Sequence, residues 1–353
     1  MRPKIGLLVN SFPVGNLRIS SLLVVAAFAT SCRLAPASTI SPGQVTQVVT
    51  FGDSLSDAGN ASIATGGTVP GPGYATRTVP GVPFPVGYFT NPQSGTGPSG
   101  LWIDQFAAKV GVADPSPALA PLGGTNYAVG GALTGSANLG DMQTQVDLFL
   151  ATHPGSASPT ALYTLWGGAN DIFATQNPIT AADNIATQIK ELAADGGKNF
   201  LWLNLPSLGD TPSLNGNPPA AAAANLASQA FDQEWAAQVA NLDSLGINVI
   251  GVDINTLFND ILADPAAFGF SNVVAACNAT PGCDPNTFLY WDDIHPTTYA
   301  DSLVASLAYQ DAFGGPVGVT PEPPTVTLLG LGAAGLLALF RTRPNHRNAT
   351  NAL

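Results

Sequence analysis

The sequence predicts an α/β fold in which a parallel β-sheet is covered by helices on both faces. The first observation is that short apolar segments typical of strands alternate along the chain with longer segments of helical spacing. The second is that 45% of the 353 residues are hydrophobic, enough for the core of one large domain or two small ones. The third is that 38 glycines and 30 prolines indicate long irregular loops between short elements.

About five segments are predicted to be the strands of this sheet. Each is a short apolar run, and the flanking glycines and prolines mark where the strands end. The first run, at residues 44–50, contains three valines and turns at Gly52, and the second, at 125–132, includes a glycine pair. The remaining strands are predicted at residues 160–166, 200–205 and 247–252.

Helices are predicted between the strands, and we find no internal repeat. Residues 220–245 form a long alanine-rich segment whose apolar side chains recur at helical spacing. Its buried side is predicted to carry Leu226, Phe231, Trp235 and Val239. Pro296 is predicted to open the last helix, which runs to about residue 313. The other helices are predicted at residues 101–110, 139–150, 179–194 and 254–262.

Residues 61–100 are rich in Gly, Pro, Ser and Thr, with scattered aromatic residues. The segment is too long for a connecting turn, and loops of this length are usually functional or mobile. We interpret it as a rim over the functional site.

The charge of the chain argues against one class of partner. The net charge is −12, but seven of the 11 basic residues lie before residue 41 or after residue 340. The middle of the chain therefore has four basic residues against all 23 acidic ones, a net charge of −19. A body this acidic repels phosphate backbones, which argues against nucleic acid as a partner.

Residues 1–37 have the pattern of a secretory signal peptide. Basic residues precede an apolar run at 22–29, and Ala35-Pro36-Ala37 supplies small residues for cleavage before Ser38. A lipoprotein signal ending at Cys32 is the alternative. The residues ahead of that cysteine, Ala29-Thr30-Ser31, match such a signal poorly.

Two cysteines, Cys277 and Cys283, remain in the chain that follows the signal. They flank a turn-rich loop at residues 278–282, which can bring the two thiols within bonding distance. In an exported protein this spacing predicts a local disulfide. A metal site needs more ligands than these two thiols, so no metal is predicted here.

Ser54 is the candidate nucleophile. It follows the first predicted strand, and the carboxyl edge of a parallel sheet is where open α/β folds place their ligands. A serine in this position acts as a nucleophile if a histidine and a carboxylate activate it. The alternative interpretation of Gly52-Asp53-Ser54 is a turn or a helix cap.

Of the three histidines, only one is a candidate for the residue that activates Ser54. His153 lies in a Pro-Gly-Ser loop and His346 lies beyond the apolar C-terminal run, whereas His295 follows Asp292 by three residues. An aspartate at that spacing can orient the imidazole while its other nitrogen faces the serine. Read alone, Asp-x-x-His is also compatible with a turn before Pro296.

The order of these motifs resembles the GDSL (SGNH) hydrolase family. Four segments of the family occur in order over roughly residues 45–312. They are Phe51 to Asn60, Asn126 to Ala132, Gly168-Ala169-Asn170-Asp171, and Asp292 to Thr297. A further segment, residues 204–209, resembles a structural part of the family. The family's Gly-Arg-Phe-Ser-Asn-Gly segment is replaced here by residues 90–95, so the rim differs from the usual one.

The resemblance implies a flavodoxin-like three-layer α/β/α sandwich and a set of catalytic roles. Ser54 would be the nucleophile, His295 the general base and then acid, and Asp292 the orienting carboxylate. The oxyanion hole would consist of the Ser54 amide, the Gly131 amide, with Gly130 as the alternative, and the Asn170 side chain. No cofactor or metal is implied. The chain has no Gly-x-Ser-x-Gly elbow, which disfavours the α/β-hydrolase arrangement.

The C-terminal residues are predicted to direct the protein to its location and not to be part of the fold. A Pro321-Glu322-Pro323 motif precedes an apolar run at 326–340 and the basic residues Arg341 and Arg343. Fifteen residues fall short of the ~20 of an ordinary spanning helix. The pattern resembles the PEP-CTERM sorting signal of bacteria that produce exopolysaccharide, and a plain membrane anchor is the alternative.

Together these features predict three parts: a signal peptide at 1–37, a hydrolase domain at 38–316, and a sorting or anchor segment at 317–353. The predicted function is that of a secreted serine hydrolase that cleaves carboxylic esters, an esterase or lipase. A polysaccharide deacetylase or acetylesterase of the same fold is the alternative, and a non-enzymatic matrix protein is the third interpretation. The expected partners are an ester of a lipid or acylated carbohydrate and a sorting machinery. The expected location is the cell surface or extracellular matrix of a bacterium.

Overall fold

The computed structural model of the chain describes residues 40–93 and 97–314. The predicted signal peptide and C-terminal sorting segment lie outside the described residues. Within the described part, the main sheet has four parallel strands in the order β1-β4-β5-β6. These strands are β1 (Gln47–Gly52), β4 (Ala161–Trp166), β5 (Asn199–Leu203) and β6 (Asn248–Val252).

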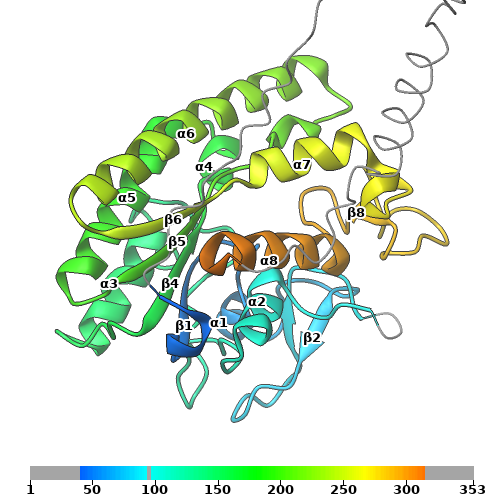
Figure 1. The fold of residues 1–353 in the computed structure, drawn as a ribbon. Coiled ribbons are helices and arrows are strands. Elements are labelled where there is room, and N and C mark those ends of the chain that lie inside the picture. Colours follow the sequence, from blue (N-terminus) through cyan, green and yellow to red (C-terminus); the bar gives the residue numbers. More distant parts are fainter. Residues whose placement is uncertain (1–39, 94–96, 315–353) are drawn as a thin grey trace, which may run out of the picture. The chain divides into compact units, whose positions relative to one another are not determined.

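Helices follow the strands as the alternation in the sequence predicts (Figure 1). They are α1 (Asn60–Ala64), α2 (Trp102–Val110), α3 (Met142–Thr152), α4 (Ala169–Phe173), α5 (Pro178–Ala194), α6 (Pro218–Ser244), α7 (Ile254–Ala263) and α8 (Thr298–Phe313). Short 3₁₀ turns are η1 (Pro42–Gln44), η2 (Leu208–Asp210) and η3 (Pro265–Phe268).

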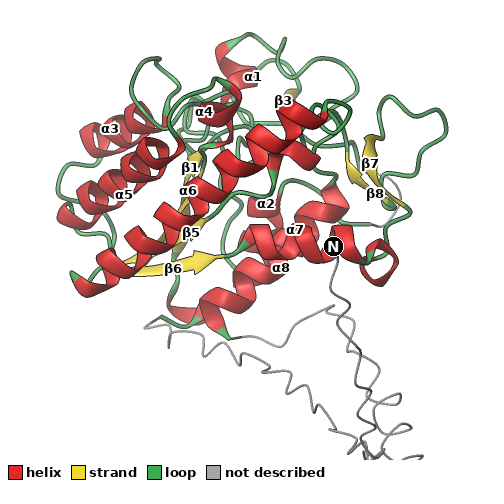
Figure 2. Cartoon of the chain, turned by 90° about the horizontal axis from the view of Figure 1, so that it is seen from above, coloured by secondary structure: helices red, strands yellow, loops and turns green. Residues whose placement is uncertain are grey.

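The sheet is covered on both faces because its strands are apolar on both sides. Successive side chains of a strand point to opposite faces. In β1, Val48 packs into a core with α2, α7 and α8, whereas Val49 and Phe51 pack into a second core with α3, α5 and α6. Figures 1 and 2 show the two sets of helices on either side of the sheet. The predicted three-layer α/β/α fold is confirmed.

The second predicted strand, residues 125–132, is only partly formed. Its first residues run parallel to β1: Thr125 accepts from the Thr50 N–H, and the Tyr127 N–H donates to Thr50. The pairing is interrupted at the Gly52 N–H, which the side chain of Gln145 on α3 accepts (2.9 Å). The Gly52 carbonyl still accepts the Val129 N–H (3.1 Å) and also accepts Nε2 of Gln145 (2.7 Å). The segment makes isolated bridges instead of a strand. Its place beside β1 still gives the strand order typical of flavodoxin-like sheets.

The predicted rim contains regular structure that the sequence pattern does not reveal. α1 lies at its start, and β2 (Ala75–Arg77) pairs antiparallel with β3 (Val86–Tyr88). A second small sheet pairs β7 (Asn272–Ala276) with β8 (Phe288–Tyr290), and the bonded Cys277 and Cys283 lie between these two strands in sequence. β8 leads directly into the segment that carries Asp292 and His295.

Helix α6 corrects one detail of the predicted core. Phe231 is fully buried, and Trp235 and Val239 pack against the same core, as predicted. Leu226 is 67% exposed, so its placement on the buried side is wrong. The apolar residues of this helix form too narrow a stripe to bury all four positions.

Candidate active site

Ser54 lies in a tight turn at the carboxyl end of β1. The strand ends at Gly52, where an added Cβ would lie 2.4 Å from the backbone oxygen of Trp166 on the neighbouring strand. Only glycine permits this close approach. The turn is closed by the Ser56 N–H, which donates to the Asp53 carbonyl (3.1 Å), and by the Leu55 N–H, which donates to the Asp53 carboxylate (3.0 Å). Ser54 therefore lies just beyond the carboxyl end of β1, where it lines a pocket.

His295 and Asp292 meet Ser54 from the other end of the chain. Nε2 of His295 lies 2.8 Å from Oγ of Ser54, and Nδ1 lies 2.7 Å from Oδ2 of Asp292. All three residues are largely buried, at 7–8% exposure. The structure thus joins them in one continuous chain of hydrogen bonds, the geometry that an activated serine requires.

The turn at residues 292–295 holds the histidine in place. Oδ1 of Asp292 accepts the backbone N–H groups of Ile294 (2.8 Å) and His295 (2.7 Å), so one carboxylate braces both the backbone and the ring. Burial by itself would raise the pKa of Asp292. The hydrogen bonds from His295 and the charge of its ring outweigh burial and hold the pKa well below its usual value. Asp292 is therefore ionised throughout the neutral range.

Ser56, the neighbouring serine, is not placed for the same role. It is fully buried, and its Oγ accepts the indole N–H of Trp102 at 3.0 Å. The serine hydroxyl that reaches His295 belongs to Ser54.

The geometry distinguishes the two glycines proposed for the oxyanion hole. The Gly130 N–H donates to the carboxylate of Asp57 at 2.8 Å, so it is already used. The N–H groups of Gly131 and Ser54 have no acceptor among the described residues. Gly131 has a φ of +80°, which favours glycine. The arrangement supports Gly131 over Gly130 as the donor.

Asn170 lies in the first turn of α4, which follows β4 directly. Its Nδ2 donates one hydrogen to the Ala132 carbonyl at 3.0 Å, which leaves the second hydrogen for a ligand. Asn170 lines the same pocket as Ser54 and His295. The third predicted donor is therefore beside the nucleophile.

Asp57 is a supporting residue that the sequence reasoning did not single out. Its carboxylate accepts N–H groups from Gly59, Asn60, Ala61 and Gly130. Because it ties α1 to the glycine pair, it fixes the position of Gly131 relative to Ser54. Asp57 lies within the motif at residues 51–60, and its place in that motif is the sequence feature that points to it.

The site opens into a small pocket of about 40 Å³ that is partly open to solvent. Most of its lining is apolar, and its polar residues are Asp53, Ser54, Asn170, Thr211 and His295. The apolar lining consists of Leu55, Trp166, Ala169, Phe173, Pro206, Leu208, Phe258, Tyr290, Ile294 and Pro296. Such a pocket suits an apolar group attached to a polar reacting centre.

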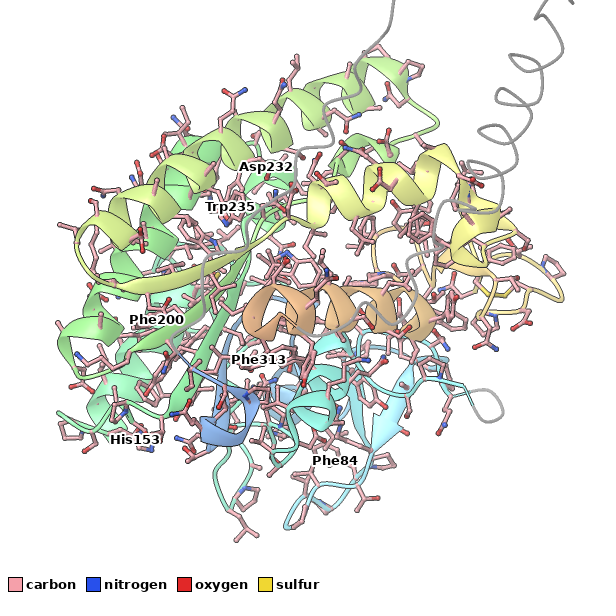
Figure 3. All side chains as sticks on the ribbon, in the orientation of Figure 1. Phe84, His153, Phe200, Asp232, Trp235 and Phe313 are labelled. Atoms are coloured by element: carbon pink, nitrogen blue, oxygen red, sulfur yellow. A yellow bond between two sulfur atoms is a disulfide. The ribbon has the colours of Figure 1, made fainter. Side chains whose placement is uncertain are left out.

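The other predicted residues lie elsewhere. His153 stacks on Phe149 at the end of α3 and lines a small pocket with Gln47 at the start of β1, the opposite edge of the sheet from Ser54 (Figure 3). His346 is outside the described residues. Cys277 and Cys283 are bonded to each other. In the described ranges, no cluster of three or more His, Cys, Asp or Glu side chains is arranged to hold a metal ion.

Comparison with known proteins gives a consistent picture. The family model described as GDSL-like Lipase/Acylhydrolase matches residues 48–308. "Esterase EstA" of Pseudomonas aeruginosa is 30% identical over 330 residues, which cover 81% of this chain and 49% of that protein. "Phosphatidylcholine-sterol acyltransferase" of Aeromonas hydrophila is 27% identical over 246 residues, 65% of each chain.

The match to curated relatives is partial in length, and solved structures are more distant. The chain spans about half the length of the first curated relatives it matches, 51% and 49%. The crystal structure of Est24, a carbohydrate acetylesterase from Sinorhizobium meliloti, covers 76% of this chain and 96% of its own, with 15% identity and a TM-score of 0.39.

Proposed function

Because this chain belongs to the GDSL-like lipase/acylhydrolase family, we propose that it hydrolyses carboxylic esters through an acyl-enzyme intermediate on Ser54. One observation supports this most directly. Hydrogen bonds link Ser54 Oγ to His295 and His295 to Asp292, and Ser54 lines an apolar pocket. No cofactor is needed for this chemistry.

The proposed reaction has two half-reactions. Ser54 Oγ attacks the ester carbonyl carbon while Nε2 of His295 takes the hydroxyl proton, and the carbonyl oxygen becomes an oxyanion. The amides of Ser54 and Gly131 and the side chain of Asn170 would stabilise that charge. The C–O bond then breaks, and the alcohol leaves with the proton from His295. A water molecule attacks the acyl-enzyme by the same steps and releases the acid and free Ser54.

The test combines active-site labelling with a substrate panel. A fluorophosphonate probe should label Ser54 in the wild type and in Ser56→Ala, but should label nothing in Ser54→Ala. The wild type should also hydrolyse p-nitrophenyl esters, assayed from acetate to palmitate. Absence of labelling together with absence of hydrolysis across the panel would overturn the proposal, and an adduct on Ser56 would reassign the nucleophile.

A second observation favours an acylated carbohydrate as the natural ester. A polar groove of about 860 Å³ lies between α6 and α7. Asn204 and Ser207 line this groove, and their neighbours Pro206 and Leu208 line the apolar pocket. Its lining is rich in amides, which can donate to and accept from sugar hydroxyls. It includes Asn204, Asn225, Gln229, Gln233, Asn255 and Asn259, with Asp232 and Trp235 on α6 (Figure 3).

Acetylated xylan tests this second candidate. Gln229→Ala combined with Gln233→Ala should lower the rate on acetylated xylan several-fold and leave hydrolysis of p-nitrophenyl acetate unchanged. Gln238→Ala is the matched control, because Gln238 is on the same helix but bonds Asp183 and Glu234 outside the groove. Equal rates of all variants on the polysaccharide would exclude the groove from substrate binding.

We also propose export, with retention at the cell surface or in the extracellular matrix of a bacterium. The support is in the sequence alone: the signal pattern at residues 1–37, and the Pro-Glu-Pro motif, apolar run and basic tail that would engage a sorting machinery. Within the part of the chain that the structure describes, no helix has the length and apolarity to cross a membrane.

Cell fractionation tests the proposed location. Full-length protein should leave the cytoplasm and lose a tag placed after residue 353, whereas a variant with Pro321 and Glu322 replaced by Ala should keep the tag. A tag retained in the membrane fraction by both proteins would favour the plain anchor, and fatty acylation of Cys32 would favour the lipoprotein signal.

A further inference from the structure

The carboxylate of Asp292 has a partner beyond Ser54 and His295. The hydroxyl of Tyr74, which lies 218 residues earlier in the predicted rim, donates to Oδ2 of Asp292 at 2.5 Å. We propose that Tyr74 is a positioning residue of the hydrolytic site that acts through Asp292 to set how strongly His295 attracts a proton. The inference rests on the proposed ester hydrolase function and makes the rim part of the catalytic apparatus.

The first argument is the complete pairing of Asp292. An ionised carboxylate has about four lone-pair sites for donors. Oδ1 of Asp292 takes the N–H groups of Ile294 and His295, and Oδ2 takes Nδ1 of His295 and the hydroxyl of Tyr74. Without Tyr74, the oxygen that faces the imidazole would have one partner in place of two. A hydrogen bond to a charged group in a buried site is also stronger than one between neutral groups.

The second argument is that Tyr74 is held in place by packing. Its ring contacts Phe89 and Trp291 edge to face, with centroid distances of 6.4 Å to each. Phe89 in turn lies against the His295 ring at 5.1 Å. The absence of a side chain at Gly130 admits Phe89, because an added Cβ would lie 2.4 Å from that ring. The rim thus places the Phe89 ring against the imidazole of His295 and the Tyr74 hydroxyl against the carboxylate of Asp292.

The third argument is the anchoring of the backbone beside Tyr74. The next residue, Ala75, opens β2 and its N–H donates to the Thr90 carbonyl at 2.9 Å. Two residues further, Arg77 pairs with Asp104 on α2 and with Asp114, and lies over the ring of Tyr88 at 4.5 Å. Because this segment is constrained, the Tyr74 hydroxyl is held in one position against Oδ2 of Asp292. A hydroxyl on a mobile surface loop would not be held in this way.

The charged groups that face this cluster are the same in wild type and Tyr74→Phe, so a difference between the two reports on the hydroxyl. The charges that act on it come from three places: Asp53 after β1, Asp292 and His295 in the turn, and the exposed Asp293 beside them. Burial, together with the hydrogen bond to Asp292, raises the pKa of Tyr74 well above its usual value. Tyr74 therefore remains a donor over the whole range in which an esterase is assayed.

Removal of the hydroxyl changes the balance between Asp292 and His295. In Tyr74→Phe, the negative charge on Oδ2 is no longer shared with a donor, so it attracts the His295 imidazolium more strongly. In the free enzyme, His295 then keeps its imidazolium proton to a higher pH. The neutral imidazole that acts as general base therefore forms only at a higher pH. The acid limb of the kcat/KM profile should move to higher pH.

The experiment compares wild type, Tyr74→Phe and Tyr163→Phe on p-nitrophenyl acetate across the pH range. Tyr163 is the matched control, because its hydroxyl donates to the Ser158 carbonyl near the start of β4. Tyr74→Phe should shift the acid limb upward by about 0.3 to 1 pH unit and lower kcat at its plateau about 3- to 10-fold, with KM little changed. Tyr163→Phe should match the wild type in all three measures.

A purely structural role predicts another result. If Tyr74→Phe lowers the melting temperature or raises KM but leaves the acid limb in place, the inference is wrong. A wild-type profile with wild-type kcat would also overturn it.

A measurement without substrate separates this inference from the proposed function. The low-field proton resonance of the bond between His295 Nδ1 and Asp292 should shift in Tyr74→Phe and stay unchanged in Tyr163→Phe. If the wild type hydrolysed no ester while this resonance shifted, the proposed function would fail and the positioning by Tyr74 would stand. An unshifted resonance in an active enzyme would remove Tyr74 from the mechanism.

Discussion

Asn170 is the side chain whose proposed role is most easily separated from its structural one. If its free amide hydrogen stabilises the oxyanion, Asn170→Ala should lower kcat and kcat/KM together by about 10²–10³, with little change in KM. Asn170→Asp should be at least as damaging, because an ionised carboxylate repels the oxyanion. Steady-state kinetics and melting temperatures of both variants decide the matter.

Both Asn170 variants lose the bond to the Ala132 carbonyl, so they share any structural cost. An active Asn170→Asp enzyme would show that the residue only caps the start of α4. That result would remove Asn170 from the mechanism.

At the scale of residues, the sequence predicts well what is local and poorly what is distant. The Asp292–His295 spacing and the turn at Ser54 are visible in short motifs, and elimination among three histidines selects His295. Tyr74 could not be predicted, because nothing in a glycine- and proline-rich segment shows which aromatic ring will reach a carboxylate 218 residues away. The preference for Gly131 over Gly130 likewise depends on a single hydrogen bond, which the Gly130 N–H donates to Asp57.

Gln145 shows how one side chain interrupts the pairing between two segments. It is 3% exposed, accepts the Gly52 N–H, and donates to the Gly52 and Gly140 carbonyls. Gln145→Ala should lower the free energy of unfolding by roughly 2–5 kcal/mol, because it leaves buried backbone groups without partners. Urea unfolding followed by circular dichroism measures this loss.

Gln143 on the same helix provides the comparison for Gln145. Its amide contacts only the carboxylates of Asp147 and Glu191 near the surface, so Gln143→Ala should change stability by about 0.5 kcal/mol or less. Equal effects of the two substitutions would show that Gln145 does not support the end of β1.

At the scale of elements, periodicity predicts most of the sheet and helices but not the edges of the fold. The four strands β1, β4, β5 and β6 are apolar on both faces and read as continuous runs. The 125–132 segment follows β1 as far as Val129, yet it does not form a regular strand, because the side chain of Gln145 takes the Gly52 N–H. The hairpin β2–β3 was not predicted, because strands of three residues within loop-like composition carry no periodic signal.

Buried acids make the stability of the whole molecule depend on pH. Burial raises the pKa of Asp53 and of Asp232 to about 7, and raises that of Asp301 well above its usual value. Between the unfolded value of 3.8 and these values, the native state holds protons that the unfolded chain has released. Stability therefore falls as pH rises through this window, by ~1.4 kcal/mol per pH unit for each such group.

Asp292 acts in the opposite direction but in another range. Its lowered pKa contributes stability that is complete above about pH 4 and is lost only as pH falls below that value. We expect a higher melting temperature at pH 5 than at pH 8. Asp232→Asn, which keeps the oxygen that accepts the Leu205 N–H, should reduce this difference. A melting temperature that rises from pH 5 to pH 8 would contradict the assignment of these buried acids.

The serine and the histidine of the site come from opposite ends of the described chain, 241 residues apart. A polypeptide is synthesised from its N-terminus, so Ser54 is made long before the residue that would activate it. Until the turn at 292–295 has emerged and α8 has packed against α2, the serine is an ordinary alcohol. Under the proposed function, an unfinished chain therefore has no activated serine, and hydrolysis begins only when the last elements of the fold are in place.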